Sequence, residues 1–197
     1  MKTLLLLCAA VFTSATTTNE LPIGAAMPMG DVKMKDISGK QVSLNDAKKK
    51  NGLLVMFSCN TCPWVVKNQE RTRDIAAYAL EKNIGVILVN SNEGQRGDDD
   101  SYESMQQYAK ENGYKWFYTV DENSAVADAF GATRTPENFL FNAEGKLVYH
   151  GATDDNPGDA AGVKRRHLKE AINEMLSGKD VSVATTRSVG CGIKRVK

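Results

Sequence analysis

The chain has 197 residues, of which 42% are hydrophobic, and this is enough to bury a core and form one domain. Its formal net charge is +1, a near balance that argues against nucleic acid or an anionic membrane surface as a partner. Four cysteines occur, and their positions carry most of the chemical information in the sequence.

Residues 1–15 show the three regions of a secretory signal peptide: a basic start at Lys2, an apolar core, and small residues at its end. The apolar core is too short to span a membrane. We therefore expect cleavage of this leader and export to the periplasm or the extracellular space, with no stable insertion into a membrane. Cleavage also removes Cys8, so the mature chain keeps three cysteines in a compartment where disulfides persist.

The mature chain is expected to begin with an extension that leads into the domain. Residues 16–28 are polar and then rich in Gly, Ala, Met and Pro, which indicates a linker. Weak alternation over residues 31–37, a Ser-Gly-Lys turn and a short stretch at residues 41–44 together predict a hairpin. A short helix is expected to follow Ser43.

The next segment carries a Cys-x-x-Cys pair. An unbroken apolar run at residues 53–57 precedes Cys59 and Cys62, and an amphipathic helical pattern covers about residues 62–82. This order predicts a buried strand that delivers two thiols to the N-terminus of a helix, where the helix dipole and unpaired N–H groups stabilise negative charge. We expect Cys59 to be the exposed thiol, with a lowered pKa, and Cys62 to close a small disulfide ring with it.

The rest of the chain alternates between strand and helix patterns. These patterns predict a buried parallel strand at 84–89, a polar loop at 90–100, a helix from 100 or 101 to 112, a strand at 115–120, a small helix at 123–130, a hairpin of strands 138–142 and 147–151, and a closing helix at 163–176. The order predicts an α/β fold in which a central mixed β-sheet is flanked by helices on both faces.

A family resemblance rests on three features: Cys59-Asn60-Thr61-Cys62-Pro63 after a buried strand, Thr135-Pro136 before a hairpin, and a closing helix. Together they resemble the thioredoxin fold, and specifically its extracytoplasmic, peroxiredoxin-related redoxin branch. The resemblance covers approximately residues 23–178. We accordingly expect a thioredoxin-like domain at residues 29–178, with residues 179–197 as a C-terminal tail.

The resemblance implies a thiol–disulfide oxidoreductase. In such an enzyme Cys59 attacks a substrate disulfide and Cys62 resolves the mixed disulfide. The resemblance also implies that Pro136 is cis and presents the backbone at Thr135 to the substrate chain. Trp64, just past the second cysteine, is expected near the surface, where it would help to position a partner.

Two departures from the thioredoxin pattern bear on the chemistry. Thioredoxins usually carry Trp before the first cysteine and Gly-Pro between the two, whereas this chain has Ser58 and Asn60-Thr61 there. Thioredoxins also carry a buried acid in the strand, and here the strand is apolar, with Met56 near that place. Proton transfer by a strand carboxylate is therefore not expected at Cys62.

A thiol peroxidase is one alternative function. The peroxidase subgroup of this family uses Pro-x-x-x-Thr-x-x-Cys around its reactive cysteine. Neither Cys59 nor Cys62 has that pattern, because Met56 lies three residues before Cys59, and Cys59 lies three residues before Cys62. Disulfide exchange is therefore preferred over peroxide reduction.

A non-enzymatic carrier or binding module is the alternative from another class. A Cys-x-x-Cys pair serves half of a zinc site, and further ligands could come only from Cys191, His150 and His167. Copper carriers of the same fold combine two cysteines with a distant His, for which His150 is the candidate. A static disulfide in a partner-binding domain is the third form of this alternative. We expect no metal and no cofactor beyond the dithiol.

Cys191 lies between two glycines in the tail, and these make its backbone permissive. We expect the tail to dock near the Cys-x-x-Cys pair, with Cys191 as a possible third thiol that exchanges with Cys59; a tail thiol without a role is the alternative. The expected partners are protein disulfides or dithiols and an electron donor or acceptor, and the protein is expected to be a monomer. The motif does not give the direction of electron flow.

Overall fold

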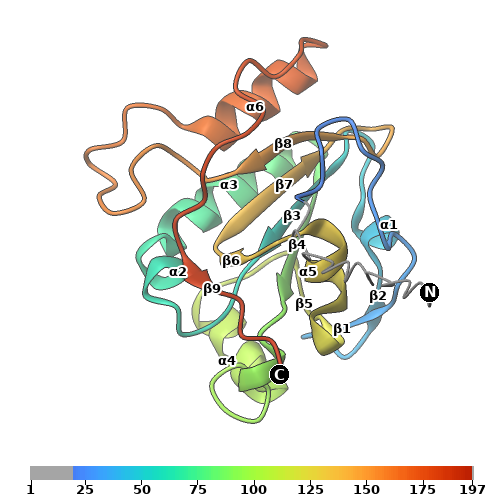
Figure 1. Ribbon diagram of the computed structural model, residues 1–197, viewed down its shortest axis with the longest axis vertical. Coiled ribbons are helices and arrows are strands. Elements are labelled where there is room, and N and C mark those ends of the chain that lie inside the picture. Colours follow the sequence, from blue (N-terminus) through green and yellow to red (C-terminus); the bar gives the residue numbers. More distant parts are fainter. Residues whose placement is uncertain (1–19, 197) are drawn as a thin grey trace, which may run out of the picture.

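A computed structural model describes residues 20–196. The expected leader, residues 1–15, lies outside this range, as does the first part of the expected linker. Figure 1 shows the arrangement of helices and strands. In the described part of the chain, no helix is both long and apolar enough to cross a membrane.

Seven strands form one mixed sheet in the order β2-β1-β5-β4-β3-β7-β8, and β6 pairs separately with β9. The strands are β1 (Met34–Asp36), β2 (Gln41–Val42), β3 (Leu53–Phe57), β4 (Gly85–Asn90), β5 (Phe117–Val120), β6 (Arg134–Thr135), β7 (Glu137–Phe141), β8 (Leu147–Gly151) and β9 (Cys191–Gly192). Strands β3, β4 and β5 run parallel, whereas β7 is antiparallel to both β3 and β8. The expected N-terminal hairpin is β1–β2, which joins the sheet through β5.

Helices cover both faces of the sheet. The helices are α1 (Leu44–Ala47), α2 (Pro63–Lys67), α3 (Gln69–Glu81), α4 (Tyr102–Glu111), α5 (Ala125–Phe130) and α6 (His167–Leu176), with short 3-10 turns η1 (Glu93–Gln95) and η2 (Glu122–Ser124). One core cluster packs α1 and α5 on one face, and a second packs α3, α4 and α6 on the other. The predicted mixed sheet with helices on both faces is therefore confirmed.

The central strand β3 is apolar because both of its faces are covered. All five of its side chains are buried, with exposed fractions of 1% or less. It lies between parallel β4 and antiparallel β7, so it is an interior strand with a continuous hydrophobic sequence. This position fixes the place at which the chain leaves the sheet and enters the Cys-x-x-Cys segment.

The single helix predicted over residues 62–82 is wrong in one respect, because it is broken at Asn68. That residue has φ −96° and ψ 4°, and it separates α2 from α3. Its side-chain amide donates to the carbonyl of Trp64 at 2.7 Å and to that of Pro157 at 3.1 Å. An Asn side chain that bonds locally to the backbone competes with helix continuation, and here it also ties the break to a distant loop.

The segments expected to be a linker and a tail are packed on the domain wherever they are described. The N–H of Gly24 donates to the carbonyl of Leu147, and that of Leu147 donates back to Ala25. In the tail, the N–H of His150 donates to Ala184, and the N–H of Thr186 donates to His150. In Figure 1 the tail runs from α6 past α2 and β6 to the C-terminus. The described parts of both segments thus belong to the folded domain.

Candidate functional site

The cysteine pair lies where β3 gives way to α2, as the sequence predicts. Cys59 follows the strand after Ser58, and Cys62 is the N-cap of α2, with Pro63 at the first helical position. All three cysteines of the described chain are free thiols in this structure. A thiol at a helix N-terminus lies where unpaired backbone N–H groups favour its charged form.

Thr135 contacts both sulfurs of the pair. Its Oγ1 lies 3.2 Å from the Sγ of Cys59, and its carbonyl oxygen lies 3.3 Å from the Sγ of Cys62. The peptide bond between Thr135 and Pro136 is cis, as the resemblance implies. The side chain and carbonyl of one buried residue therefore hold the two thiols side by side.

The expectation that Cys59 is exposed is wrong. Cys59 and Cys62 expose only 2% and 4% of their surface. A hydrogen bond from the Cys59 thiol lowers the pKa of Cys62 to about 4. The Cys191 thiol and the N–H groups of Val65 and Cys191 lower it further, whereas burial of the sulfur acts in the opposite direction. The same bond, together with burial, raises the pKa of Cys59. The shared hydrogen bond therefore lowers the pKa of Cys62 and raises that of Cys59, whereas a lowered pKa was expected for Cys59.

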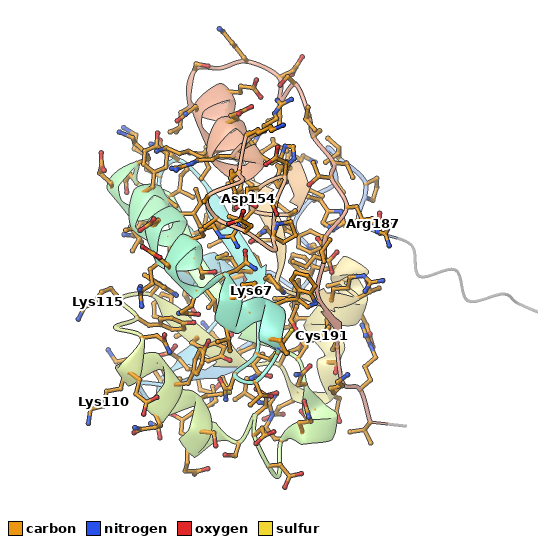
Figure 2. All side chains as sticks on the ribbon, turned by 90° about the vertical axis from the view of Figure 1, so that its left-hand side faces the viewer. Lys67, Lys110, Lys115, Asp154, Arg187 and Cys191 are labelled. Atoms are coloured by element: carbon orange, nitrogen blue, oxygen red, sulfur yellow. The ribbon has the colours of Figure 1, made fainter. Side chains whose placement is uncertain are left out.

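Cys191 joins the pair as a third sulfur. It is the antiparallel partner of Thr135 in the β6–β9 ladder, and it packs with Trp64 against the cluster of Cys59, Cys62 and Val65. Figure 2 looks onto α2 and shows Cys191 on the strand that passes beside this helix. The tail thus docks at the site as expected, and a hydrogen bond between the thiols of Cys191 and Cys62 shifts the pKa of both.

The glycine before Cys191, expected from the sequence to make the backbone permissive, allows close packing here. A Cβ atom at Gly190 would lie 2.2 Å from the carbonyl oxygen of Thr135, closer than any side chain allows. At Gly192 a Cβ would meet nothing nearer than 4.0 Å. Only glycine at position 190 therefore permits β9 to lie against the residue that holds the sulfurs.

Trp64 is half-buried and lies against the sulfur cluster. Its backbone N–H is directed at the sulfur of Cys191 and helps to stabilise a thiolate there. Val66, on the next turn of α2, is 54% exposed. Trp64 therefore lies at the boundary between the buried sulfurs and the surface, consistent with its expected place.

A buried carboxylate from the segment predicted to be a polar loop anchors the Cys-x-x-Cys segment. Asp100 is fully buried and accepts from the backbone N–H of Asn60 at 2.9 Å and from the side-chain amides of Asn90 and Asn92 at 2.8 Å each. One feature of the sequence indicates that this segment lies near the cysteines. Residues 90–100 follow β4, and the carboxyl end of β4 lies beside that of β3. The sequence did not show which of three consecutive aspartates turns inward.

A second buried acid fixes the loop before Pro136. Glu137 accepts from the N–H groups of Thr133 and Arg134 at 2.8 and 3.1 Å through one oxygen. Its other oxygen lies 2.9 Å from Nε2 of His150. Glu137 lies one residue before the strand predicted at 138–142, and no local pattern marks its carboxylate as buried.

The ligand sets considered for copper or zinc are not assembled. His150 is engaged with Glu137 and stacks on Phe139, with ring centroids 4.3 Å apart, and His167 lies at the start of α6. Within residues 20–196, no group of three or more His, Cys, Asp and Glu side chains is arranged to hold a metal ion. The arrangement observed around Cys59 and Cys62 is one of thiols, a hydroxyl and backbone groups.

Comparisons with known proteins agree with this geometry. The redoxin family model matches residues 22–168. The thiol-disulfide oxidoreductase ResA of Bacillus subtilis (strain 168) is 27% identical over 149 residues, covering 74% of this chain and 78% of that protein.

Solved structures show the same fold. An uncharacterized conserved protein from Geobacillus kaustophilus superposes with a TM-score of 0.83 at 32% identity, covering 90% of this chain and 94% of its own. The thioredoxin domain of a thiol-disulfide oxidoreductase from Bacteroides vulgatus gives 0.55 at 23% identity, covering 66% and 89%. The fold is therefore thioredoxin-like.

Proposed function

The chain belongs to the redoxin family, and on this premise we propose that it is an exported thiol–disulfide oxidoreductase that exchanges disulfides through Cys59 and Cys62. The observation that carries the proposal is the contact of Thr135 with both sulfurs. A residue that holds two thiols side by side next to a cis-proline positions them for a bond to each other and to a substrate sulfur. The substrates are protein disulfides or dithiols.

Cys59 attacks and Cys62 acts first as its base. In the resting pair the Cys59 thiol donates to the Cys62 thiolate, so attack by Cys59 on a substrate disulfide passes its proton to Cys62. A nucleophile that is weak as a thiol is commonly activated by an adjacent base. This arrangement gives Cys59 a proton acceptor that does not depend on a carboxylate in strand β3.

The remaining step resolves the mixed disulfide. The first substrate sulfur leaves as a thiolate and takes up a proton, and Cys62 loses its proton again and attacks the Sγ of Cys59. The second substrate sulfur then leaves. Two electrons pass from the Cys59–Cys62 dithiol to the substrate disulfide, which becomes two thiols, and the pair becomes a disulfide. Every step is a thiol–disulfide exchange, so no cofactor takes part.

Reduction of insulin by dithiothreitol tests the proposal. We expect the mature protein to accelerate the reaction and Cys59→Ser to fall to the uncatalysed rate, while Lys110→Ala, at an exposed position on α4, keeps the wild-type rate. Equal rates for wild type and Cys59→Ser would refute the enzyme. Replacing insulin with hydrogen peroxide tests the peroxidase alternative. That alternative requires the wild type to consume peroxide and Cys59→Ser not to do so.

Export is part of the same proposal, because residues 1–15 have the composition of a signal peptide. Sequencing the N-terminus of the protein recovered from the periplasm or medium of an expressing cell tests it. We expect the chain to begin near Thr16. Recovery only inside the cell with Met1 or Lys2 at the N-terminus would contradict it.

A further inference from the structure

We propose that Cys191 is a third exchange cysteine, through which an external thiol reduces the oxidised site by way of a Cys62–Cys191 disulfide. The inference rests on the proposed function, because it supplies the half-reaction that returns the Cys59–Cys62 pair to its dithiol form. In this scheme the oxidised substrate reacts with Cys59, and the reductant reacts with Cys191. The reductant is a thiol or dithiol, small or carried by a protein.

The position of Cys191 is fixed by backbone pairing on both sides. Before it, the N–H of Thr186 donates to the carbonyl of His150 at 3.0 Å. After it, the N–H of Ile193 donates to Thr133 at 3.0 Å, and the N–H of Gly94 donates to Lys194 at 2.7 Å. The tail is therefore hydrogen-bonded to the domain on both sides of Cys191, and we call residues 186–194 the strap. The sulfur of Cys191 is held against the cysteine pair by this segment.

The three sulfurs differ in how accessible they are to solvent. Cys59 and Cys62 are buried, whereas Cys191 is only partly covered. Thiol–disulfide exchange needs direct approach to the attacked sulfur, so access decides which sulfur an external thiol meets. While the strap is docked, Cys191 is the sulfur of the cluster that a reductant reaches.

The exchange needs no added oxidant. Starting from the Cys59–Cys62 disulfide, the Cys191 thiolate attacks the Sγ of Cys62. The Cys62–Cys191 bond forms, the Cys59–Cys62 bond breaks, and Cys59 leaves as a thiolate and takes the proton released by Cys191. One disulfide replaces another, with no net change in electrons.

The external thiol completes the reduction. Its thiolate attacks the Sγ of Cys191, and Cys62 leaves as a thiolate. A second external thiolate attacks the external sulfur bound to Cys191, which releases Cys191 and gives the oxidised external disulfide. Two electrons have entered the site, and all three cysteines are thiols or thiolates.

The charges around the sulfurs favour this sequence. Burial, the hydrogen bond with Cys62 and the charge on Cys62 raise the pKa of Cys191 in the reduced site, whereas Lys194 and the N–H of Trp64 lower it. Formation of the Cys59–Cys62 disulfide removes the charge on Cys62, so that burial alone is left to oppose Lys194 and the N–H of Trp64, the two groups that favour a Cys191 thiolate. A low thiol pKa also makes Cys62 the better leaving group when the external thiol attacks Cys191.

Disulfide mapping of Cys59→Ser provides the first test. After oxidation with diamide and digestion, we expect a peptide in which Cys62 is bonded to Cys191. Recovery of Cys62 and Cys191 only as separate, alkylated peptides would overturn the inference. Cys191→Ser treated in the same way should contain the Cys59–Cys62 disulfide, and failure of both this variant and the wild type to form it would instead refute the proposed function.

Reduction kinetics provide the second test and distinguish chemistry from packing. The oxidised wild type, Cys191→Ser and Cys191→Ala are mixed with glutathione, and recovery of free Cys62, which is bonded in both disulfides, is followed by alkylation and mass spectrometry. We expect at least a tenfold slower recovery in both variants, the change that about 1.4 kcal/mol of barrier produces. A Cys191 that only covers the site would give equal or faster recovery when replaced, because a loosened strap exposes the pair, and this result would overturn the inference.

Discussion

Cys191 lies directly opposite Thr135 in the β6–β9 ladder, and Thr135 contacts both sulfurs of the Cys59–Cys62 pair. The chain's own tail therefore occupies the backbone edge next to the cis-proline. Extended peptides bind such exposed edges through main-chain hydrogen bonds. Under the proposed function, a protein substrate that paired with the backbone of Thr135 would have to displace β9.

Replacing Gly190 by Ala should detach the strap. The new Cβ would lie 2.2 Å from the carbonyl of Thr135, and overpacking of this kind typically costs about 1–3 kcal/mol. We expect this loss in the free energy of unfolding by urea, together with faster alkylation of Cys59 and Cys62 by iodoacetamide.

Gly192→Ala is the matched control, because a Cβ there has no contact nearer than 4.0 Å. We expect its stability and alkylation rate to remain close to those of the wild type. If Gly190→Ala and Gly192→Ala behave alike, the close approach of β9 to Thr135 has no part in covering the site.

The reduced protein should titrate one thiolate at low pH. The pKa of Cys62 is lowered to about 4, so its thiolate persists above that pH and is lost below it, whereas the raised pKa of Cys59 keeps that thiol protonated. Ultraviolet thiolate absorbance against pH should show a step near pH 4 in the wild type that is absent in Cys62→Ser. A step that survives in Cys62→Ser and disappears in Cys59→Ser would place the charge on Cys59.

Asp100→Asn should loosen the Cys-x-x-Cys segment. An amide cannot accept all three of the hydrogen bonds that the buried carboxylate accepts, and a lost hydrogen bond to a charged group costs about 1.5–3 kcal/mol. We expect a loss of this size in the free energy of unfolding. Asp99→Asn is the control, because that side chain is exposed and only its backbone carbonyl binds Asn60. Equal losses in the two variants would contradict the anchoring role.

Glu137→Ala should destabilise the loop that leads to the cis-proline. It leaves the N–H groups of Thr133 and Arg134 and the ring of His150 without their shared acceptor, at about 1–3 kcal/mol for each unsatisfied buried group. Glu137→Gln retains an acceptor oxygen, so a smaller loss is expected. Urea unfolding of both variants provides the comparison, and an undiminished stability of Glu137→Ala would refute this role.

The central part of the site was predictable because its signals are local. The apolar run of β3 and the Cys-x-x-Cys spacing before an amphipathic helix predict the strand, the thiols and the helix N-terminus from consecutive residues. The cis peptide before Pro136 followed from the family resemblance. These elements depend on short segments whose hydrophobic pattern and capping residues specify one local structure.

The rest depends on contacts between distant segments. Strand β9 has two residues and forms only because Thr135 and Gly190 approach closely, so no periodicity in the tail predicts it. Asp100 is buried by contacts with Asn60 of the Cys-x-x-Cys segment and with Asn90 and Asn92 at the end of β4, and the two residues before it are also acidic. The pKa values of the sulfurs depend on how Cys191 docks, and a motif within one segment does not contain that contact.

Equilibration of the mature protein in glutathione redox buffers, followed by alkylation and disulfide mapping, tests the central claim most directly. We expect one two-electron transition whose oxidised product contains the Cys59–Cys62 disulfide and, in exchange with it, the Cys62–Cys191 disulfide. The midpoint also gives the reduction potential and hence the direction of electron flow with a given partner. If Cys59 and Cys62 remain thiols across the whole series, or a bond between them fails to return to thiols in reducing buffer, the protein does not exchange disulfides through this pair.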